Sequence, residues 1–207
     1  MKKFMFLALS LTTLAASAAP YLPTSGRQVI ETLPRRADPG QQDILRMREH
    51  LRAAPSDVRL ATALARRYIA IGRSETDPRY FGYAQAALAP WWNSKAPPHE
   101  VRLLRATLLQ STHHFAEAMA DLDAITIVAP GDAQAWLTRA TVQTVQGDYD
   151  GATKSCARLS ALASQLASFA CLGNVAGVSG RLAASERLLD QALARNADAP
   201  ADEQAWV

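Results

Sequence analysis

The two cysteines of the chain, Cys156 and Cys171, are its strongest candidates for covalent chemistry. They lie at nearly equal distances from a predicted turn near residues 163–164, so two antiparallel helices would bring them face to face. A bridge there closes a loop of about 15 residues and would contribute roughly 3 kcal/mol of stability. We expect a disulfide, with two buried free thiols as the alternative. A redox-active pair is not expected, because the chain has no Cys-X-X-Cys motif.

Histidines and closely spaced aspartates are the other chemically capable groups. His113 and His114 are adjacent and point in different directions, whereas zinc needs three or four converging ligands. The aspartates stand two apart: Asp121 with Asp123, and Asp148 with Asp150. This spacing places the members of a pair on different helix faces, so we interpret them as solvated or capping acids. The sequence also lacks a nucleophile elbow, a phosphate-binding glycine loop and a zinc motif, so we expect no enzymatic activity, no cofactor and no metal.

The segment 1–18 has the features of a secretory signal peptide. Lys2 and Lys3 precede an apolar run over residues 4–14, and the small residues of 16–18 predict cleavage after Ala18. The apolar run is shorter than the roughly 20 residues of a membrane-spanning helix. We therefore expect export to the periplasm, or secretion, of a protein that does not span the membrane after cleavage. An uncleaved anchor is the alternative.

Composition favours a folded chain with no affinity for nucleic acid. Of the 207 residues, 49% are hydrophobic and 20% are charged, which argues against disorder. The formal net charge is +3, and removal of the two lysines of the signal peptide lowers it to +1. Because the remaining cations are scattered and balanced by acids, we expect no nucleic-acid partner.

A pattern of large, small and aromatic residues recurs with a period of about 34 residues. It is clearest over residues 136–152 and is repeated before and after that segment. The recurring positions are Trp136, Ala140, Gly147, Tyr149 and Ala152; Ala106, Phe115 and Ala118 lie one period earlier, Ala84 lies two periods earlier, and Gly173, Gly180 and Ser185 lie one period later, in a repeat that is shorter by a single residue. Such a period predicts pairs of helices that bury their apolar faces only against neighbouring pairs.

This pattern resembles the tetratricopeptide repeat (TPR) family. The resemblance implies an all-α fold, an α-solenoid of antiparallel helix pairs that forms a right-handed superhelix. His113 departs from the family at a turn position where glycine is usual, and Arg102 departs where a large apolar residue is usual. Asp57 and Asp132, each shortly after a proline, are predicted to cap the helices that follow them.

The repeat divides the chain into successive segments. The predicted organisation is a signal peptide at 1–18, an extended proline-rich lead at 19–40, an N-terminal half-repeat or cap helix at 41–55, repeat units at 56–98, 99–132, 133–165 and 166–198, and the start of a truncated fifth unit at 199–207. The first unit carries an insertion of seven residues between Gly72 and Ala84. The alternative to truncation is that residues 205–207 fold onto the last helix.

The resemblance implies that the first helices of the units form a concave groove for a protein or peptide partner. The residues that would face this groove are Arg59, Thr62, Arg66, Ile69, Leu103, Thr107, Gln110, Gln134, Leu137, Thr138, Thr141 and Asn174. The groove would be mostly neutral and rich in hydroxyls, with positive charge at the end formed by the first unit.

The expected function is that of a non-catalytic exported scaffold that binds its partner in this groove. The alternative is a structural accessory subunit of a cell-envelope or secretion complex, assembled through the convex face or through an interaction edge at Trp91 and Trp92. Those two tryptophans have a second interpretation, in which they fill an irregular helix end. A helical cell-wall lyase would need a catalytic glutamate in a non-repeat domain, which the sequence does not predict.

Overall fold

The computed structural model of the chain describes residues 21–31 and 39–199. The chain divides into two units, residues 1–37 and 38–207. In the first unit, residues 21–31 form an extended segment with one turn, in which the Gln28 amide donates to the Ser25 carbonyl over 3.1 Å. The predicted signal peptide and residues 200–207 of the predicted fifth unit lie outside the described residues.

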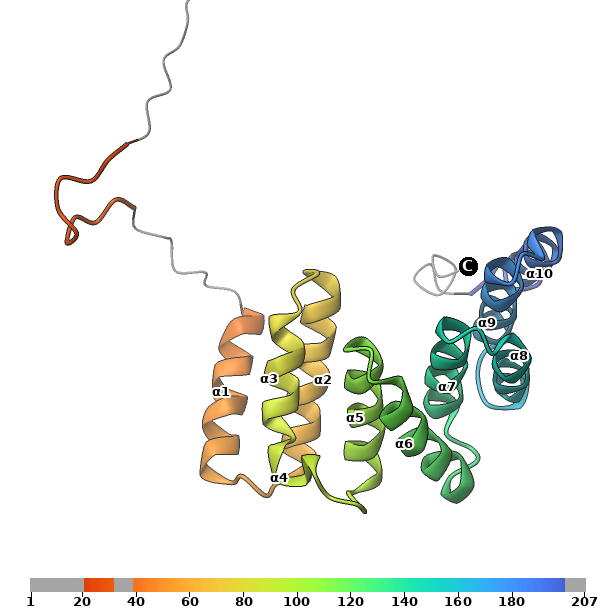
Figure 1. Cartoon of the computed structure of the whole chain (residues 1–207), viewed down its shortest axis with the longest axis horizontal. Helices are drawn as coiled ribbons and strands as arrows, with labels where there is room; N and C mark the ends of the chain where they lie inside the picture. Colours follow the sequence, from red (N-terminus) through yellow and green to blue (C-terminus); the bar gives the residue numbers. More distant parts are fainter. Residues whose placement is uncertain (1–20, 32–38, 200–207) are drawn as a thin grey trace, which may run out of the picture. The chain divides into compact units, whose positions relative to one another are not determined.

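The described part of the second unit contains helices and no strands, which confirms the all-α prediction (Figure 1). Its helices are α1 (Pro39–Ala53), α2 (Val58–Ser74), α3 (Arg79–Ala87), α4 (Ala89–Trp92), α5 (His99–Ser111), α6 (Phe115–Val128), α7 (Ala133–Val145), α8 (Tyr149–Arg158), a 3-10 turn (Leu159–Ala161), α9 (Gln165–Val178) and α10 (Leu182–Arg195). The helices pack in adjacent pairs, α2 with α3, α5 with α6, α7 with α8 and α9 with α10. None of these helices is both long and apolar enough to cross a membrane.

Local sequence explains where the helices begin. The Asp57 carboxylate accepts from the Leu60 amide over 3.0 Å, and the Asp132 carboxylate accepts from the Ala135 amide over 2.9 Å, which confirms both predicted caps. Asp148 caps α8 in the same way. These side chains satisfy amides that the first turn of a helix leaves without a partner.

Small residues allow the two helices of a pair to approach closely. Ala106, Ala118, Ala140 and Ala152 are almost completely buried at matching positions of successive pairs. At the equivalent position of the last described pair stands Gly173, where a Cβ would lie 2.6 Å from Leu189 Cδ2. Larger residues at these positions would push the paired helices apart.

The buried apolar residues form three clusters that follow one another along the second unit. The first joins α1, α2, α3 and α5 around Leu64 and Leu88, the second joins α5, α6 and α7 around Leu122, and the third joins α7, α8 and α9 around Leu159. The core is therefore shared between successive helix pairs, as the repeat in the sequence predicts.

The seven-residue insertion of the first unit lengthens its helices rather than forming a loop. Helix α2 has 17 residues, whereas α5 and α7 have 13 each. The connection to α3 is only residues 75–78. Pro90 then stands in the first turn of α4, and the second helix of this unit is divided into α3 and α4.

The turn of the α5–α6 pair contains an unusual backbone conformation. His113 has a φ of 64°, in the left-handed region that Gly147 and Gly180 occupy in the next two pairs, with φ values of 81° and 83°. A side chain is unfavourable in this region. The His113 ring lies edge-on to Phe115, with ring centroids 5.4 Å apart. His113 therefore stands in place of the usual glycine, and the turn keeps the same backbone conformation.

We expect the substitution Ala118→Leu to lower the free energy of unfolding by about 1–3 kcal/mol, because the larger side chain has no space between α5 and α6. Urea denaturation followed by circular dichroism measures the change. The matched control is Ala116→Leu, an exposed position on the same helix, where little change is expected. Equal effects of the two substitutions would contradict the proposed role of small residues.

Candidate partner-binding surface

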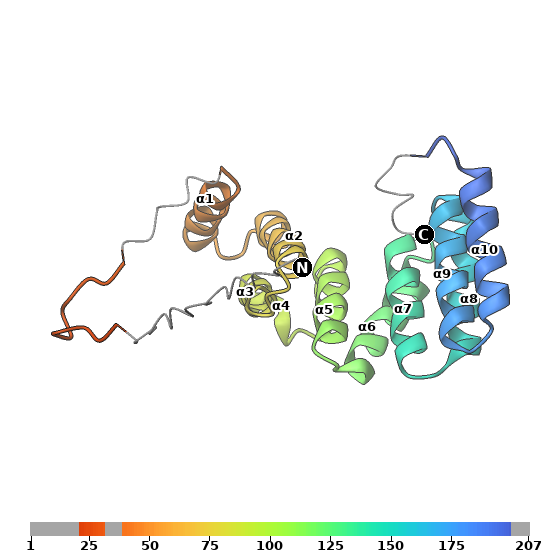
Figure 2. The ribbon, with the colours of Figure 1, turned by 90° about the horizontal axis from the view of Figure 1, so that it is seen from above.

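The first helices of the four pairs lie next to one another and form the candidate binding surface. Helix α2 contacts α5, α5 contacts α7, and α7 contacts α9. Figure 2 shows these four helices in succession. Residues on corresponding faces of the four helices therefore belong to one continuous surface, which we call the first-helix surface.

The structure divides the predicted residues of this surface by their accessibility. The exposed ones are Arg59, Arg66, Gln134, Thr141 and Asn174; Leu103, Gln110 and Leu137 are half-buried; Thr62, Ile69, Thr107 and Thr138 are buried. The buried residues contribute to packing rather than to an accessible surface. The accessible part is therefore smaller than the sequence predicted.

The threonine hydroxyls are engaged with their own helices. Thr107 donates to the Leu103 carbonyl over 2.9 Å, and Thr138 donates to the Gln134 carbonyl over 2.9 Å. Thr62 and Thr141 make the same kind of bond to residues three and four positions earlier. A hydroxyl that donates within its own helix has only acceptor capacity left for a partner.

Free positive charge lies at the α2 end of the first-helix surface. Arg59 and Arg66 are exposed and form no ion pair within the described residues. Among the residues predicted to face the groove, the exposed ones farther along the chain are the neutral Gln134, Thr141 and Asn174. This surface can thus contact an extended segment through amide and hydroxyl groups, with an anionic group of that segment near α2.

A largely buried ion pair joins α5 to α6. The Arg105 guanidinium donates two bonds of 2.7 Å to the two oxygens of Asp121, and the two side chains are only 12% and 11% exposed. Arg105 also donates to the carbonyls of Trp92 and Ser94 over 2.6 and 2.9 Å. The interpretation of Asp121 as a solvated or capping acid is therefore wrong, because its carboxylate balances a buried guanidinium. Arg102 Nε lies 4.0 Å from the same carboxylate.

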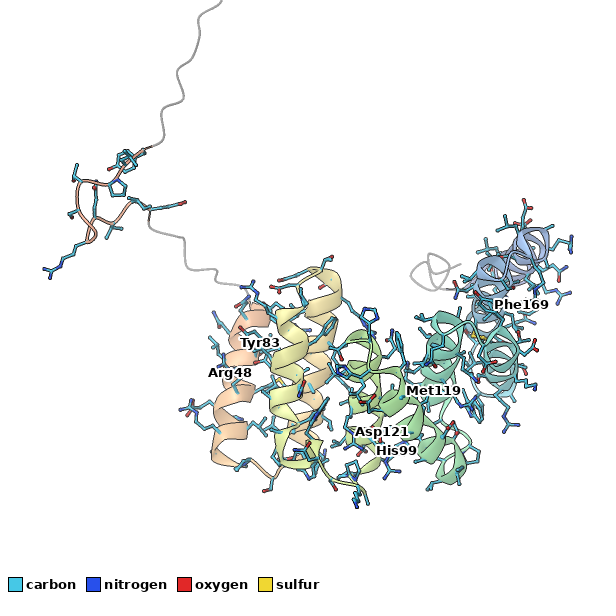
Figure 3. The ribbon with its side chains drawn as sticks, viewed as in Figure 1. Arg48, Tyr83, His99, Met119, Asp121 and Phe169 are labelled. Carbon is cyan, nitrogen blue, oxygen red and sulfur yellow. A yellow bond between two sulfur atoms is a disulfide. The ribbon has the colours of Figure 1, made fainter. Side chains whose placement is uncertain are left out.

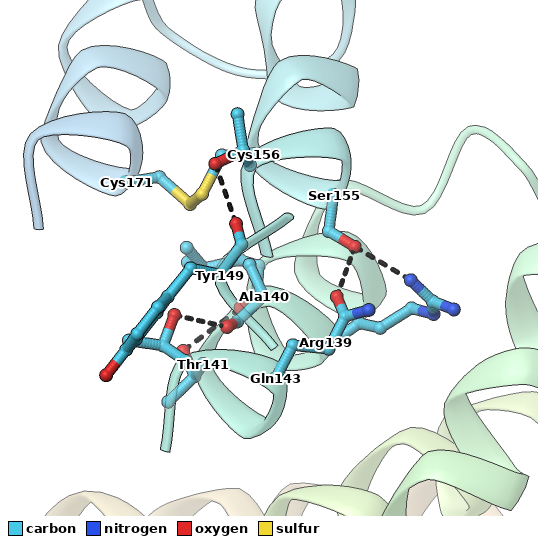
Figure 4. Close-up of a disulfide and its surroundings, with 11 residues drawn as sticks. Arg139, Ala140, Thr141, Gln143, Tyr149, Ser155, Cys156 and Cys171 are labelled. Carbon is cyan, nitrogen blue, oxygen red and sulfur yellow. Dashed lines mark hydrogen bonds between the residues drawn. A yellow bond between two sulfur atoms is a disulfide. The ribbon is translucent and has the colours of Figure 1, made fainter. Parts of the chain in front are cut away.

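A second polar network occupies the corresponding position of the next pair (Figure 4). Ser155 is completely buried; it donates to the Gln143 side chain over 2.7 Å and accepts from Arg139 over 2.9 Å. Arg139 reaches Asp123 as well, over 2.9 Å. Arg139 and Ser155 stand one repeat period after Arg105 and Asp121, so the two networks are equivalent in the repeat. The two hydrogen-bond partners of the Ser155 hydroxyl are thus an amide and a guanidinium.

The disulfide between Cys156 and Cys171 is present, and it joins α8 to α9 (Figure 4). The Cα atoms are 5.5 Å apart, within the ordinary range for a disulfide. Both residues are buried in the third cluster of the core. The bridge therefore links the α7–α8 pair covalently to the α9–α10 pair.

The two tryptophans of α4 contact the core of the first unit. Trp91 and Trp92 are half-buried and pack against the first cluster. The Trp92 carbonyl is one of the acceptors of Arg105, and the Trp92 side chain borders a cavity of about 530 Å³ that Lys95, His114 and Asp121 also line. These contacts correspond to the interpretation in which the tryptophans fill an irregular helix end.

The described residues contain no group of three or more histidines, cysteines or acids that could hold a metal ion. His113 and His114 are exposed in the α5–α6 turn, as predicted. His99 forms a 2.8 Å contact with the Asp132 carboxylate across the two helix pairs. His99 belongs to α5 and Asp121 to α6, and both are labelled in Figure 3.

Comparisons with known proteins give no family. No family model matches the chain, and no curated protein matches it. The likeness to the tetratricopeptide repeat family is carried by the residues of the chain itself.

We expect Asp121→Asn to lower the free energy of unfolding by about 3 kcal/mol, because it leaves the Arg105 guanidinium buried without a counter-charge. Chemical denaturation measures the loss. The matched control is Asp123→Asn on the same helix, whose ion-paired side chain is 51% exposed; its expected effect is below about 1 kcal/mol. A loss no greater than that of the control would show that the Arg105–Asp121 pair contributes little.

Reduction of the disulfide is expected to lower the free energy of unfolding by about 3 kcal/mol, since the bridge restricts the unfolded chain. The measurement is thermal or urea denaturation with and without dithiothreitol. The Cys156→Ala, Cys171→Ala double variant is expected to have reduced stability and no response to dithiothreitol. An unchanged transition of the wild-type protein on complete reduction would contradict this expectation.

Proposed function

We propose that this chain is a non-catalytic, exported scaffold of the tetratricopeptide repeat type that binds a protein or peptide partner along the first-helix surface. In this proposal the helix pairs continue as a right-handed solenoid. The observation that carries the proposal is the serial contact of α2, α5, α7 and α9, which aligns their exposed polar residues.

The chemistry of the surface supports an extended peptide as ligand. Gln134 and Asn174 offer side-chain amides, which can both donate to and accept from a peptide backbone. Arg59 and Arg66 would attract an acidic group at one end of the bound segment.

The proposed location is the periplasm, with secretion as the alternative. It rests on the sequence of residues 1–18 and on the disulfide, because disulfides form and persist in oxidising compartments.

Arg66→Glu is expected to lower the recovery of a bound partner about tenfold, because it reverses the charge at one end of the first-helix surface. The measurement is quantitative mass spectrometry after affinity capture from envelope extract. Arg66→Lys, which keeps the charge, should retain most of the binding. Arg187→Glu is the matched control, since Arg187 is an exposed arginine on the second helix of the last described pair. Loss of the same proteins with Arg187→Glu, or no loss with Arg66→Glu, would contradict the proposal.

A further inference from the structure

Three helices at the start of the second unit, α1, α2 and α3, border a groove. Its volume is about 610 Å³, and α1, α2 and α3 all contribute to its walls. The residues used below are Leu45 and Arg48 of α1, Leu64 and Tyr68 of α2, and Tyr83 and Ala87 of α3. We call it the α1–α3 groove. Figure 3 labels Arg48 on α1 and Tyr83 on α3.

The groove stays open because α1 covers α2 only in part. From residues 40–53 of α1, Ile44 alone belongs to the buried core, and Met47 and Leu51 pack beside it. Leu45 is 60% exposed and Tyr83 is 51% exposed. Large apolar side chains are thus left in contact with water at the mouth of the groove, as is common where another molecule binds.

Tyr68 contributes a phenolic hydroxyl to the groove, which apolar side chains such as Leu64 and Ala87 also line. The residue is only 5% exposed, and its hydroxyl makes no hydrogen bond with any described residue. Its ring packs against Tyr80 and Tyr83, with centroids 6.1 and 5.6 Å away. Burial raises the pKa of the Tyr68 phenol, so the hydroxyl keeps its proton at neutral pH and can act as a donor. Among the described residues the Tyr68 oxygen is not one of the buried polar atoms that lack a partner, so water reaches it from the groove. A ligand acceptor can therefore replace that water.

Arg48 is the free cation of the groove. It forms no ion pair with the described residues, whereas its neighbours Arg46 and Arg52 pair with Asp43 and Glu49. Arg48 lies close enough to Tyr68 for its charge to oppose the rise in the pKa of that phenol. Arg52 and Glu49 also line the groove but pair with each other, which leaves the Arg48 guanidinium as the unpaired charge of the lining. A carboxylate can accept from both Arg48 and the Tyr68 hydroxyl.

We propose that the α1–α3 groove binds an acidic peptide segment of a partner protein. A carboxylate of the segment accepts from the Tyr68 hydroxyl and pairs with Arg48. An apolar side chain next to it packs on Leu64, Tyr83 and Ala87.

The distribution of charge and the shape of the groove favour this ligand. Residues 39–98 carry nine basic and five acidic side chains, whereas residues 99–199 carry eight and ten. An acidic partner is thus attracted to the part of the chain that contains the groove. The lining runs along α1 from Leu45 to Arg52, about 10 Å, which matches about three residues of extended peptide.

This groove is separate from the first-helix surface. Arg66 and Tyr68 are two positions apart on α2, which places them about 200° apart around the helix. Substitutions in one site can therefore be made without altering the other, and failure of either proposal can be recognised independently.

The test uses two pools of fluorescein-labelled hexapeptides and the full mature protein. Both pools have leucine or phenylalanine at alternate positions; one has aspartate or glutamate between them, and the other asparagine or glutamine. Fluorescence polarisation is expected to show binding of the acidic pool at least tenfold tighter than binding of the amide pool. Tyr68→Phe and Arg48→Gln should each weaken the acidic pool about tenfold.

Three controls keep the result interpretable. Tyr68→Phe removes only a hydroxyl without a partner, so its melting temperature should not fall, which separates lost binding from lost folding. Arg46→Gln removes an arginine of the same helix that does not line the groove, and it should bind like the wild type. Arg66→Glu should weaken this binding far less than Arg48→Gln, because Arg66 does not line the groove and acts only through long-range charge. Equal binding of the two pools to the wild type, or full affinity in Tyr68→Phe, overturns the proposal.

Discussion

Among the described helices, the apolar surface of one pair is buried against the neighbouring pair, and the rest of the structure depends on that constraint. The second helix of one pair contacts the first helix of the next, as α6 contacts α7 and α8 contacts α9. Each of the three core clusters draws on more than one pair. Stability is then approximately a sum of pair and neighbour terms, and a surface built from first helices follows from the same stacking.

The parts of the fold that repeat were predictable from the sequence. Small residues such as Ala106, Ala140 and Gly173 recur at intervals of 34 and 33 residues, and the structure buries all three against a partner helix. The caps at Asp57 and Asp132 depend only on residues next to them in the chain. Periodic burial and local capping can be predicted from the sequence, because each requires a particular residue type at a particular position.

The polar contacts between helices were not predictable in the same way. Asp121 looks like a surface acid, and only the packing of α6 on α5 shows that it faces Arg105. The equivalence of Arg105 with Arg139, and of Asp121 with Ser155, is the signal that a comparison of repeats would have offered. The candidate surface was overestimated for a related reason: Thr62, Thr107 and Thr138 have polar side chains, yet each hydroxyl is satisfied within its own helix and the residue can be buried.

The bridge between α8 and α9 has a consequence for when the chain acquires its full stability. Before oxidation the two cysteines are thiols, and the helix pairs on either side of the junction are held together by packing alone. In the export that we propose, a reduced precursor would be easier to unfold, and an unfolded polypeptide is the form that a narrow translocation pore can pass. Oxidation after passage would then stabilise the fold and favour forward movement over return.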